Sequence, residues 1–478
     1  MSAGKSPSPS RPNVLLFFTD QHRLSGLGCY GPTPCRTPNL DRLAETGNRF
    51  ETAYTACPLC SPARASLMTG LHVHAHGMLS NNFEYGTCMA QLPDGEHLLP
   101  RRLAAAGYRC GYVGKWHLGG ARDEWFGAKV DVSLPRTRGF EMIDYSHQEY
   151  LDRHGLTYEP HATGGALKTE RYDGPPEASI SHWLADQSMM LIDRLAESEQ
   201  PFFLMHSDPG PHAGYTAPQC LYDQYRDAEI PPWPNYEWSS LGIDGPHRVK
   251  VHPRKEELTW DDWAETLRHY YARCTLIDMQ VGRLVDHLRR RGLLDNTLIL
   301  FTSDHGETLG SHGGLVDKGF HHFEEIQRIG MILSGPPVAQ PGRTIPQWAS
   351  LLDVYPTVLD AAGAELDPAA VHGRSLLPLL RGEEVQWRDE AFVEFFGLGN
   401  LSATLLTCRH GDLKYGWNCT SRDELYDLAA DPYETVNRID DPAYADAVGQ
   451  MRRRIEAFME RTGHRSLQGF RVTALRGA

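Results

Sequence analysis

Residues 57–70 read C-P-L-C-S-P-A-R-A-S-L-M-T-G, and the rest of the chain is organised around this stretch. Pro62 suits the first turn of a helix because it has no backbone N–H, and Gly70 suits the residue that ends one. Cys60 would then lie just before a helix N-terminus, where free N–H groups favour anions. Arg64, about one turn later, can direct its guanidinium to the same place. A sulfate or phosphate ester fits such a site, whereas a buried structural cysteine is the alternative.

The composition is that of an ordinary globular protein. The chain has 478 residues, of which 41% are hydrophobic and 23% charged, and its formal net charge is −14. An acidic balance argues against a nucleic-acid partner, which would require a basic face. The apolar run Val14–Phe18 is too short for a signal-peptide core or a membrane-spanning helix. We therefore expect a cytoplasmic protein with no nucleic-acid and no membrane partner, whose ten cysteines are reduced.

Buried-strand patterns alternate with helical patterns through most of the chain. Apolar runs such as Val14–Phe18 and Thr297–Phe301 are followed by amphipathic segments. This alternation predicts an α/β fold with a large, mixed, mostly parallel sheet sandwiched by helices. Near the C-terminus short strands follow one another closely before a last helix, which predicts a small antiparallel sheet with one helix. We expect a disordered tail over 1–12, an α/β domain over 13–382 and a small α+β subdomain over 383–478.

Four groups of polar residues directly follow buried strands. The groups are Asp20 with Gln21, Lys115 with His117, His212 alone, and Asp304 with His305. Ligands of open α/β folds bind at the carboxyl edge of the sheet, so we expect these side chains to converge there. Each group alone would be unremarkable in a loop, but convergence of all four by accident is much less expected.

These segments resemble the family of type I sulfatases. Residues 60–70 match its signature C-x-P-x-R-x-x-x-L-T-G except for Met68, where leucine is usual. Residues 107–119 resemble its second signature, and residues 301–306 its second metal segment. His212 and Lys318 stand where the family keeps a histidine and a lysine, and the resemblance runs over roughly residues 12–465. It implies an alkaline-phosphatase-like fold in which the large domain is catalytic.

The resemblance also implies a modified cysteine and a metal. Cys60 would be oxidised to formylglycine by a formylglycine-generating or sulfatase-maturing enzyme, and the hydrated aldehyde would be the nucleophile. Asp20, Gln21, Asp304 and His305, together with the Cys60-derived diol, would hold one divalent metal. Many members have aspartate and asparagine where this chain has Gln21 and His305. A nitrogen ligand makes Mn²⁺ more competitive, but the resemblance favours Ca²⁺.

The remaining roles are also taken from the resemblance. Arg64 and Lys115 would orient the diol and neutralise sulfate oxygens, and His117 would take a proton from the diol of a sulfated enzyme intermediate. His212 or Lys318 would protonate the leaving oxygen. The implied catalytic residues are therefore Cys60, Arg64, Lys115, His117, His212 and Lys318. Asn81 is expected to face the substrate, with a loop-turn role as the equal alternative.

Three functions remain open from the sequence. The first is a sulfuric ester hydrolase, the second a phosphonate monoester or phosphodiester hydrolase of the same superfamily, and the third a binding protein whose Cys60 is never converted. The loops over 125–179 and 231–253 are expected to select a small-molecule or saccharide sulfate ester. The sequence does not reveal whether the alcohol is a sugar, choline or a phenol. It also leaves the oligomeric state open, and a homo-oligomer is compatible with it.

Several histidines outside these groups invite a functional interpretation. His72, His74 and His76 would share one side of a strand, as metal ligands do, but we favour structural or solvent-facing roles. His321 and His322, close to Lys318 in sequence, are weaker candidates for lining the pocket.

Overall fold

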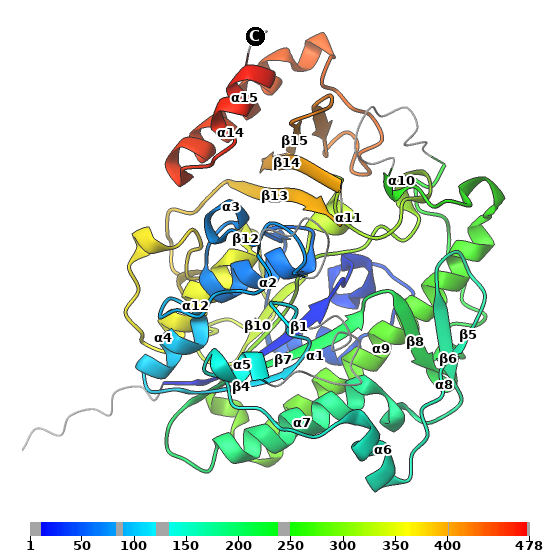
Figure 1. Cartoon of the computed structure of the whole chain (residues 1–478), viewed down its shortest axis with the longest axis vertical. Helices are drawn as coiled ribbons and strands as arrows, with labels where there is room; N and C mark the ends of the chain where they lie inside the picture. Colours follow the sequence, from blue (N-terminus) through cyan, green and yellow to red (C-terminus); the bar gives the residue numbers. More distant parts are fainter. Residues whose placement is uncertain (1–10, 83–88, 121–132, 238–248, 400, 476–478) are drawn as a thin grey trace, which may run out of the picture.

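The computed structural model describes residues 11–82, 89–120, 133–237, 249–399 and 401–475. At its centre is a seven-stranded sheet of order β11-β2-β10-β9-β1-β7-β4 (Figure 1). β10 is antiparallel to both of its neighbours, and the other neighbouring pairs are parallel. The predicted large, mixed and mostly parallel sheet is thereby confirmed. Its strands are β1 (Asn13–Asp20), β2 (Gly47–Phe50), β4 (Arg109–Gly114), β7 (Phe202–Pro211), β9 (Thr297–Ser303), β10 (Met331–Ser334) and β11 (Thr344–Ile345).

Both faces of the sheet are covered by helices, as the continuous apolar strands require. Successive side chains of β1 point to opposite faces, so Leu15 and Phe17 enter one core while Leu16 and Phe18 enter the other. The first core is closed by α1 (Pro38–Thr46), α7 (Ile180–Leu195) and α9 (Trp260–Arg290). The second core is closed by α2 (Cys60–Thr69), α4 (Leu99–Ala105) and α12 (Val354–Ala361). Within this sandwich every residue of β1 and of α2 is buried.

Helix α2 begins and ends where the sequence indicated, within one residue. Cys60 is its first residue rather than the residue before it, and Pro62 lies in the first turn. Gly70 caps the C-terminus with φ 70°, a left-handed conformation that glycine adopts without strain. Every residue of α2 is buried, so its N-terminus lies inside the protein.

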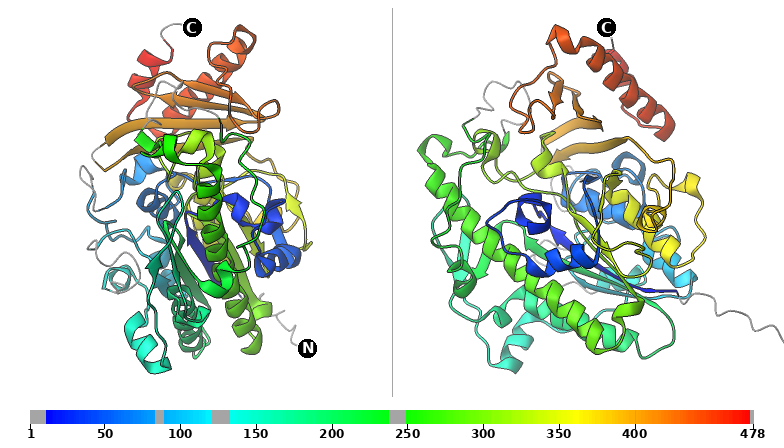
Figure 2. Two further views of the ribbon diagram at one scale, coloured as in Figure 1. Left: turned by 90° about the vertical axis from the view of Figure 1, so that its right-hand side faces the viewer. Right: turned by 180° about the vertical axis from the view of Figure 1, so that it is seen from behind.

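A second sheet lies at one end of the molecule (Figure 2). It is antiparallel, of order β13-β14-β15-β16, and α14 packs on it as expected. A second helix, α15, follows α14, so the expectation of one helix was incomplete. Phe470 of α15 packs edge-on against Trp417 of β15, with ring centroids 5.3 Å apart, which anchors this extra helix. The elements are β13 (Glu390–Leu398), β14 (Leu401–His410), β15 (Leu413–Asn418), β16 (Glu424–Asp427), α14 (Ala445–Thr462) and α15 (Leu467–Thr473). The division of the chain at residue 382 stays a prediction.

The histidines after α2 connect the two sheets. His74 and His76 lie in a short helix, α3 (Val73–His76), and His72 precedes it, so these histidines do not alternate along a strand. His74 Nδ1 lies 2.6 Å from Glu394 Oε1, and its Nε2 lies 3.2 Å from the Thr462 carbonyl oxygen. Burial opposes protonation of His74, but the hydrogen bond to Glu394 outweighs it and raises its pKa. His464 also contacts Glu394, and the three side chains are close enough to hold a metal. Because both His74 nitrogens already have hydrogen-bond acceptors, we interpret His74, Glu394 and His464 as an ion-paired group that connects the two sheets.

The segment before α7 is more regular than expected. It contains α5 (Ser133–Thr137), α6 (His147–His154), β5 (His161–Ala162) and β6 (Thr169–Tyr172), and the last two form a three-stranded sheet with β8 (Gly214–Pro218). The two predicted specificity loops lie partly outside the described residues, which do not include 121–132 and 238–248. Residues 1–10 of the predicted tail also lie outside them. The remaining elements are β3 (Ala53–Tyr54), β12 (Ala349–Ser350), α8 (Gln219–Tyr222), α10 (Ser311–Gly314), α11 (Glu324–Gln327) and α13 (Leu377–Leu380).

Two general expectations can be compared with the described part of the chain. The cysteines within it are free thiols rather than disulfides. Among its helices, none combines the length and the apolar character that crossing a bilayer requires.

Candidate active site

Four parallel strands deliver polar side chains to one edge of the central sheet. Asp20 is the last residue of β1, and Lys115, His212 and Asp304 directly follow β4, β7 and β9. Because these strands run parallel, their carboxyl ends lie together. The N-terminus of α2 comes to the same edge and brings Cys60 with it.

Opposite charges are packed closely at this edge. Arg64 Nη2 lies 2.7 Å from Asp20 Oδ2 and 3.2 Å from Asp304 Oδ2, and Lys115 Nζ lies 2.6 Å from Asp20 Oδ2. Burial would raise the pKa of Asp20, but Lys115 and Arg64 outweigh it and hold that pKa well below its usual value. Asp304 behaves in the opposite way, since burial and the nearby Asp20 raise its pKa. The two carboxylates thus differ: the cations stabilise the charge of Asp20, whereas burial and Asp20 oppose the charge of Asp304.

The donor set at this edge fits a divalent metal. Ligand atoms of Asp20, Cys60, Asp304 and His305 lie within 4.8 Å of one another, and all four residues are buried. Cys60 Sγ is 3.4 Å from His305 Nε2 and 3.8 Å from Asp20 Oδ1. Burial lowers the pKa of His305, which keeps its imidazole neutral and able to coordinate. A divalent cation would also relieve the repulsion between the two carboxylates.

Gln21 enters the site in a constrained conformation. Its φ is 64°, in the left-handed region that a residue with a side chain seldom adopts. The backbone N–H donates to Asp304 Oδ1 at 2.9 Å, and the side-chain Oε1 accepts from Lys318 Nζ at 2.5 Å. In this conformation Gln21 hydrogen-bonds both to Asp304, in the predicted metal segment after β9, and to Lys318, the predicted catalytic lysine.

His212 and Lys318 form a pair next to this group. Lys318 Nζ lies 2.8 Å from His212 Nε2, and that nitrogen is 4.0 Å from Asp20 Oδ1. Burial and the charge of Lys318 hold the pKa of His212 well below its usual value, so His212 is neutral and accepts from the ammonium group. The structure therefore brings the two predicted acid–base residues into direct contact.

His117 and Asn81 lie at the N-terminus of α2. Ser61 connects them, since its hydroxyl donates to the His117 carbonyl oxygen at 2.6 Å and its N–H donates to Asn81 Oδ1 at 3.1 Å. His117 has φ 55°, and burial together with Lys115 and Arg64 holds its pKa well below the usual value. A neutral imidazole can accept a proton, which is the role predicted for His117.

Sequence reasoning missed several residues that support these side chains. Ser207 in β7 accepts from Arg64 Nη1 at 2.8 Å and donates to the Lys115 carbonyl oxygen at 2.9 Å. Glu307 and Asp317 both accept from the Gln21 amide. Glu307 follows Asp304 by three residues and Asp317 precedes Lys318, so proximity to predicted residues was the available signal.

His322, one of the two weaker histidine candidates, lies between the two sheets. His322 is buried, and its ring nitrogens contact Thr407 and Asn418 in the second sheet at 2.7 Å and 3.2 Å. His322 therefore holds the second sheet against the first instead of lining the pocket. Cys57 lies in an apolar cluster with Leu59 and Phe320, whereas Cys60 faces the charged group.

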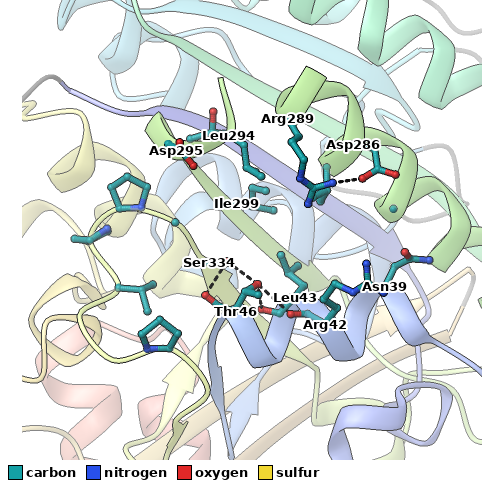
Figure 3. Close-up of a pocket in the computed structure, with 18 residues that line it drawn as sticks. Asn39, Arg42, Leu43, Thr46, Asp286, Arg289, Leu294, Asp295, Ile299 and Ser334 are labelled. Carbon is teal, nitrogen blue, oxygen red and sulfur yellow. Dashed lines mark hydrogen bonds and ion pairs between the residues drawn. The ribbon is translucent and has the colours of Figure 1, made fainter. Parts of the chain in front are cut away.

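Two cavities help to locate where a substrate fits. A cavity of about 630 Å³ lies beside His212 and is lined by residues of α6, β6 and β8, including His147 and Thr216. A second cavity of about 450 Å³ lies at the opposite end of β9, between α1 and the C-terminal end of α9 (Figure 3). Arg42 and Arg289 line the second cavity, far from the predicted site along the sheet.

The comparisons with known proteins agree with this geometry. A family model described as Sulfatase matches residues 12–364, and one described as N-sulphoglucosamine sulphohydrolase, C-terminal, matches residues 310–461. The chain belongs to the sulfatase family. It is therefore an enzyme of the sulfuric ester hydrolase family, within the alkaline-phosphatase-like superfamily. The fold that the sequence resemblance implied is confirmed.

Relatives of this sulfatase have different substrates in their names. The choline-sulfatase of Rhizobium meliloti is 32% identical over 450 residues, covering 90% of this chain and 83% of that protein. The phosphonate monoester hydrolase of Agrobacterium radiobacter has a TM-score of 0.74 at 25% identity, covering 94% and 96% of the two chains. A structure of a protein in complex with its substrate D-glucosamine-2-N,6-O-disulfate has a TM-score of 0.75 at 21% identity, covering 95% and 99%, which shows a common fold.

Proposed function

We propose that this sulfatase hydrolyses a sulfate monoester with a nucleophile derived from Cys60, through a sulfated enzyme intermediate. The observation that carries the proposal is the position of Cys60 at the buried N-terminus of α2, within a group formed by Asp20, Asp304 and His305. The positive end of that helix dipole and nearby Arg64 favour an anionic substrate group. Conversion of Cys60 to formylglycine would put diol oxygens where the thiol now lies.

The neighbouring residues divide the work of the reaction. When bound by Asp20, Gln21, Asp304 and His305, a Ca²⁺ ion, with Mn²⁺ as the alternative, would make a diol hydroxyl more acidic and stabilise negative oxygens. Lys115 adds positive charge near the sulfate oxygens, and Asn81 fixes the start of α2 through Ser61. These assignments are proposals drawn from the geometry and the family.

We assign proton transfer to three basic residues, Lys318, His212 and His117. Lys318 donates to His212, so this pair can deliver a proton to the leaving oxygen. His117, kept neutral by burial and nearby cations, would take a proton from the remaining diol hydroxyl and release sulfate. The alcohol part of the substrate would occupy the cavity of about 630 Å³ beside His212, whose lining includes residues from the segment predicted to select it.

A sulfate-release screen tests the proposal directly. The mature enzyme would be offered sulfated sugars, choline sulfate, aryl sulfates and phosphonate monoesters. We expect turnover of at least one sulfate ester with higher kcat/KM than any phosphonate. The structural similarity to a phosphonate monoester hydrolase makes that activity the second candidate. Preference for phosphonate monoesters over every sulfate would make it the better assignment.

Replacing His117 by alanine is expected to stall the second half of the reaction. Loss of a general base typically lowers a rate by about 10²- to 10⁴-fold, and formation of the adduct should be affected less. Intact-protein mass after mixing with substrate should therefore show a sulfated enzyme that accumulates. His410→Ala, which changes a half-buried histidine at the end of β14, is the control and should turn over normally. Normal turnover by His117→Ala would refute the assigned role.

A further inference from the structure

The orientation of the Gln21 amide can be assigned from its neighbours. Its Nε2 donates to Glu307 Oε2 and, at 3.1 Å, to Asp317 Oδ1, while its Oε1 accepts from Lys318 Nζ at 2.5 Å. Ionised carboxylates only accept hydrogen bonds and an ammonium group only donates them. The reverse orientation would put NH₂ against the ammonium and the oxygen against two carboxylates. Gln21 Oε1 is therefore held on the side of the catalytic groups.

The Glu307 carboxylate accepts hydrogen bonds from several neighbouring groups. It is fully buried, and its Oε1 accepts from the backbone N–H groups of Thr308 at 2.9 Å and Leu309 at 3.4 Å. Its Oε2 accepts from Gln21 and from the Tyr215 hydroxyl at 3.2 Å. With the Thr308 hydroxyl, which donates to Oε1 at 3.3 Å, five donors converge on this side chain and fix it in place.

The charges around the proposed metal site favour a neutral residue at position 21. The proposed metal ligands contain two carboxylates, and Arg64, Lys115 and Lys318 crowd the same space. A third carboxylate at position 21 would face Glu307 and Asp317 and would be repelled by them. Glutamine at position 21 and glutamate at position 307 are therefore complementary, because the amide NH₂ of the first donates to the carboxylate of the second.

We propose that Glu307 is a positioning residue: by accepting from the Gln21 amide NH₂ it holds Gln21 Oε1 toward the metal site. The inference rests on the proposed function, because it takes Gln21 as a metal ligand. Glu307 itself touches neither the metal nor the substrate in this assignment. It acts through Gln21, as carboxylates behind metal ligands do in other metalloproteins.

An exchange of the two side chains tests the inference. Gln21→Glu alone puts carboxylates face to face. Glu307→Gln alone puts an amide NH₂ against a hydrogen-bond donor, which is either the Gln21 amide or the backbone N–H groups of Thr308 and Leu309. Each should weaken metal binding by about 10- to 100-fold. In the double variant the new amide at position 307 donates to the new carboxylate at position 21, and its oxygen still accepts from Thr308 and Leu309. The exchange should therefore recover most of the lost affinity.

The measurement is titration of metal-stripped enzyme with Ca²⁺ by calorimetry, with circular dichroism to verify folding. Glu394→Gln is the matched control, because Glu394 is equally buried but contacts His74 and His464 instead of Gln21. Its metal affinity should equal that of the wild type. Should Glu307→Gln not fold, the comparison of Gln21→Glu with the exchange variant decides.

The outcomes separate this inference from the proposed function. Affinity restored by the exchange supports the inference. Unchanged affinity in both single variants, or losses in the double variant that equal the sum of the single losses, overturns it while leaving the metal site in place. A wild-type enzyme that binds no divalent ion contradicts the proposed function itself, and the inference with it.

Discussion

Cys60→Ala should reduce sulfate release by about 10⁶-fold, the loss that follows removal of an enzyme's nucleophile. The variant keeps Asp20, Asp304, His305 and Arg64, so binding of the metal and of a sulfate anion should largely persist while turnover does not. Sulfate release measured with the best ester from the substrate screen gives the rate. Peptide mass spectrometry of wild-type enzyme, made with its maturation enzyme, should show the thiol of residue 60 replaced by an aldehyde.

Cys57→Ala is the matched control for this result. Cys57 lies three residues earlier and is equally buried, but it packs among apolar side chains and contacts none of the charged groups around Cys60. Its replacement should leave kcat unchanged. Fully active protein with an unmodified Cys60 thiol, or equal losses from the two substitutions, would show that the nucleophile has been assigned wrongly.

Asp304→Asn should lower both bound metal and kcat/KM, the latter by about 10²- to 10³-fold, as for loss of one preorganised electrostatic group. Asparagine keeps the size of the side chain and an oxygen that can accept from the backbone N–H of Gln21. The substitution removes the charge, which leaves the metal with one carboxylate fewer beside Arg64. Elemental analysis of purified protein gives the metal content, and sulfate release gives the rate.

Asp353→Asn controls for the loss of any buried aspartate. Asp353 is fully buried and paired with Arg388 at 2.5 Å, away from the metal group. It should reduce stability without changing metal content. Metal content and activity that stay normal in Asp304→Asn would mean that the metal lies elsewhere.

The sequence predicted the central sheet because its strands are buried on both faces. Runs such as Val14–Phe18 and Thr297–Phe301 contain no alternation of polar residues, which is typical of parallel strands between two helical layers. The polar residues that end these runs were then expected at one edge of the sheet, and the structure brings Asp20 and Asp304 together there. Local pattern sufficed in these cases because strand direction and strand end are local properties.

Short, capped elements were harder to predict. The segment before α7 was interpreted as irregular, yet α6 begins with a capping box in which Ser146 and Glu149 satisfy each other's backbone N–H groups. That signal was present in the sequence, but glycine and proline nearby obscured it. Helix α15 has no comparable local signal, because its position depends on Phe470 packing against Trp417, 53 residues earlier in the chain.

By itself, the sequence determined the family, the main sheet, the helix that carries Cys60 and the residues that converge around it. Only the tertiary structure decided how those residues are supported. Gln21 meets Glu307 across 286 positions of sequence because β1 and β9 pair in parallel and end at the same edge. A hydrogen bond of this kind leaves no periodic trace in either segment, since neither residue changes the local pattern of its own strand or turn. Which carboxylate stands behind which ligand is therefore settled by the folding of distant segments onto one another.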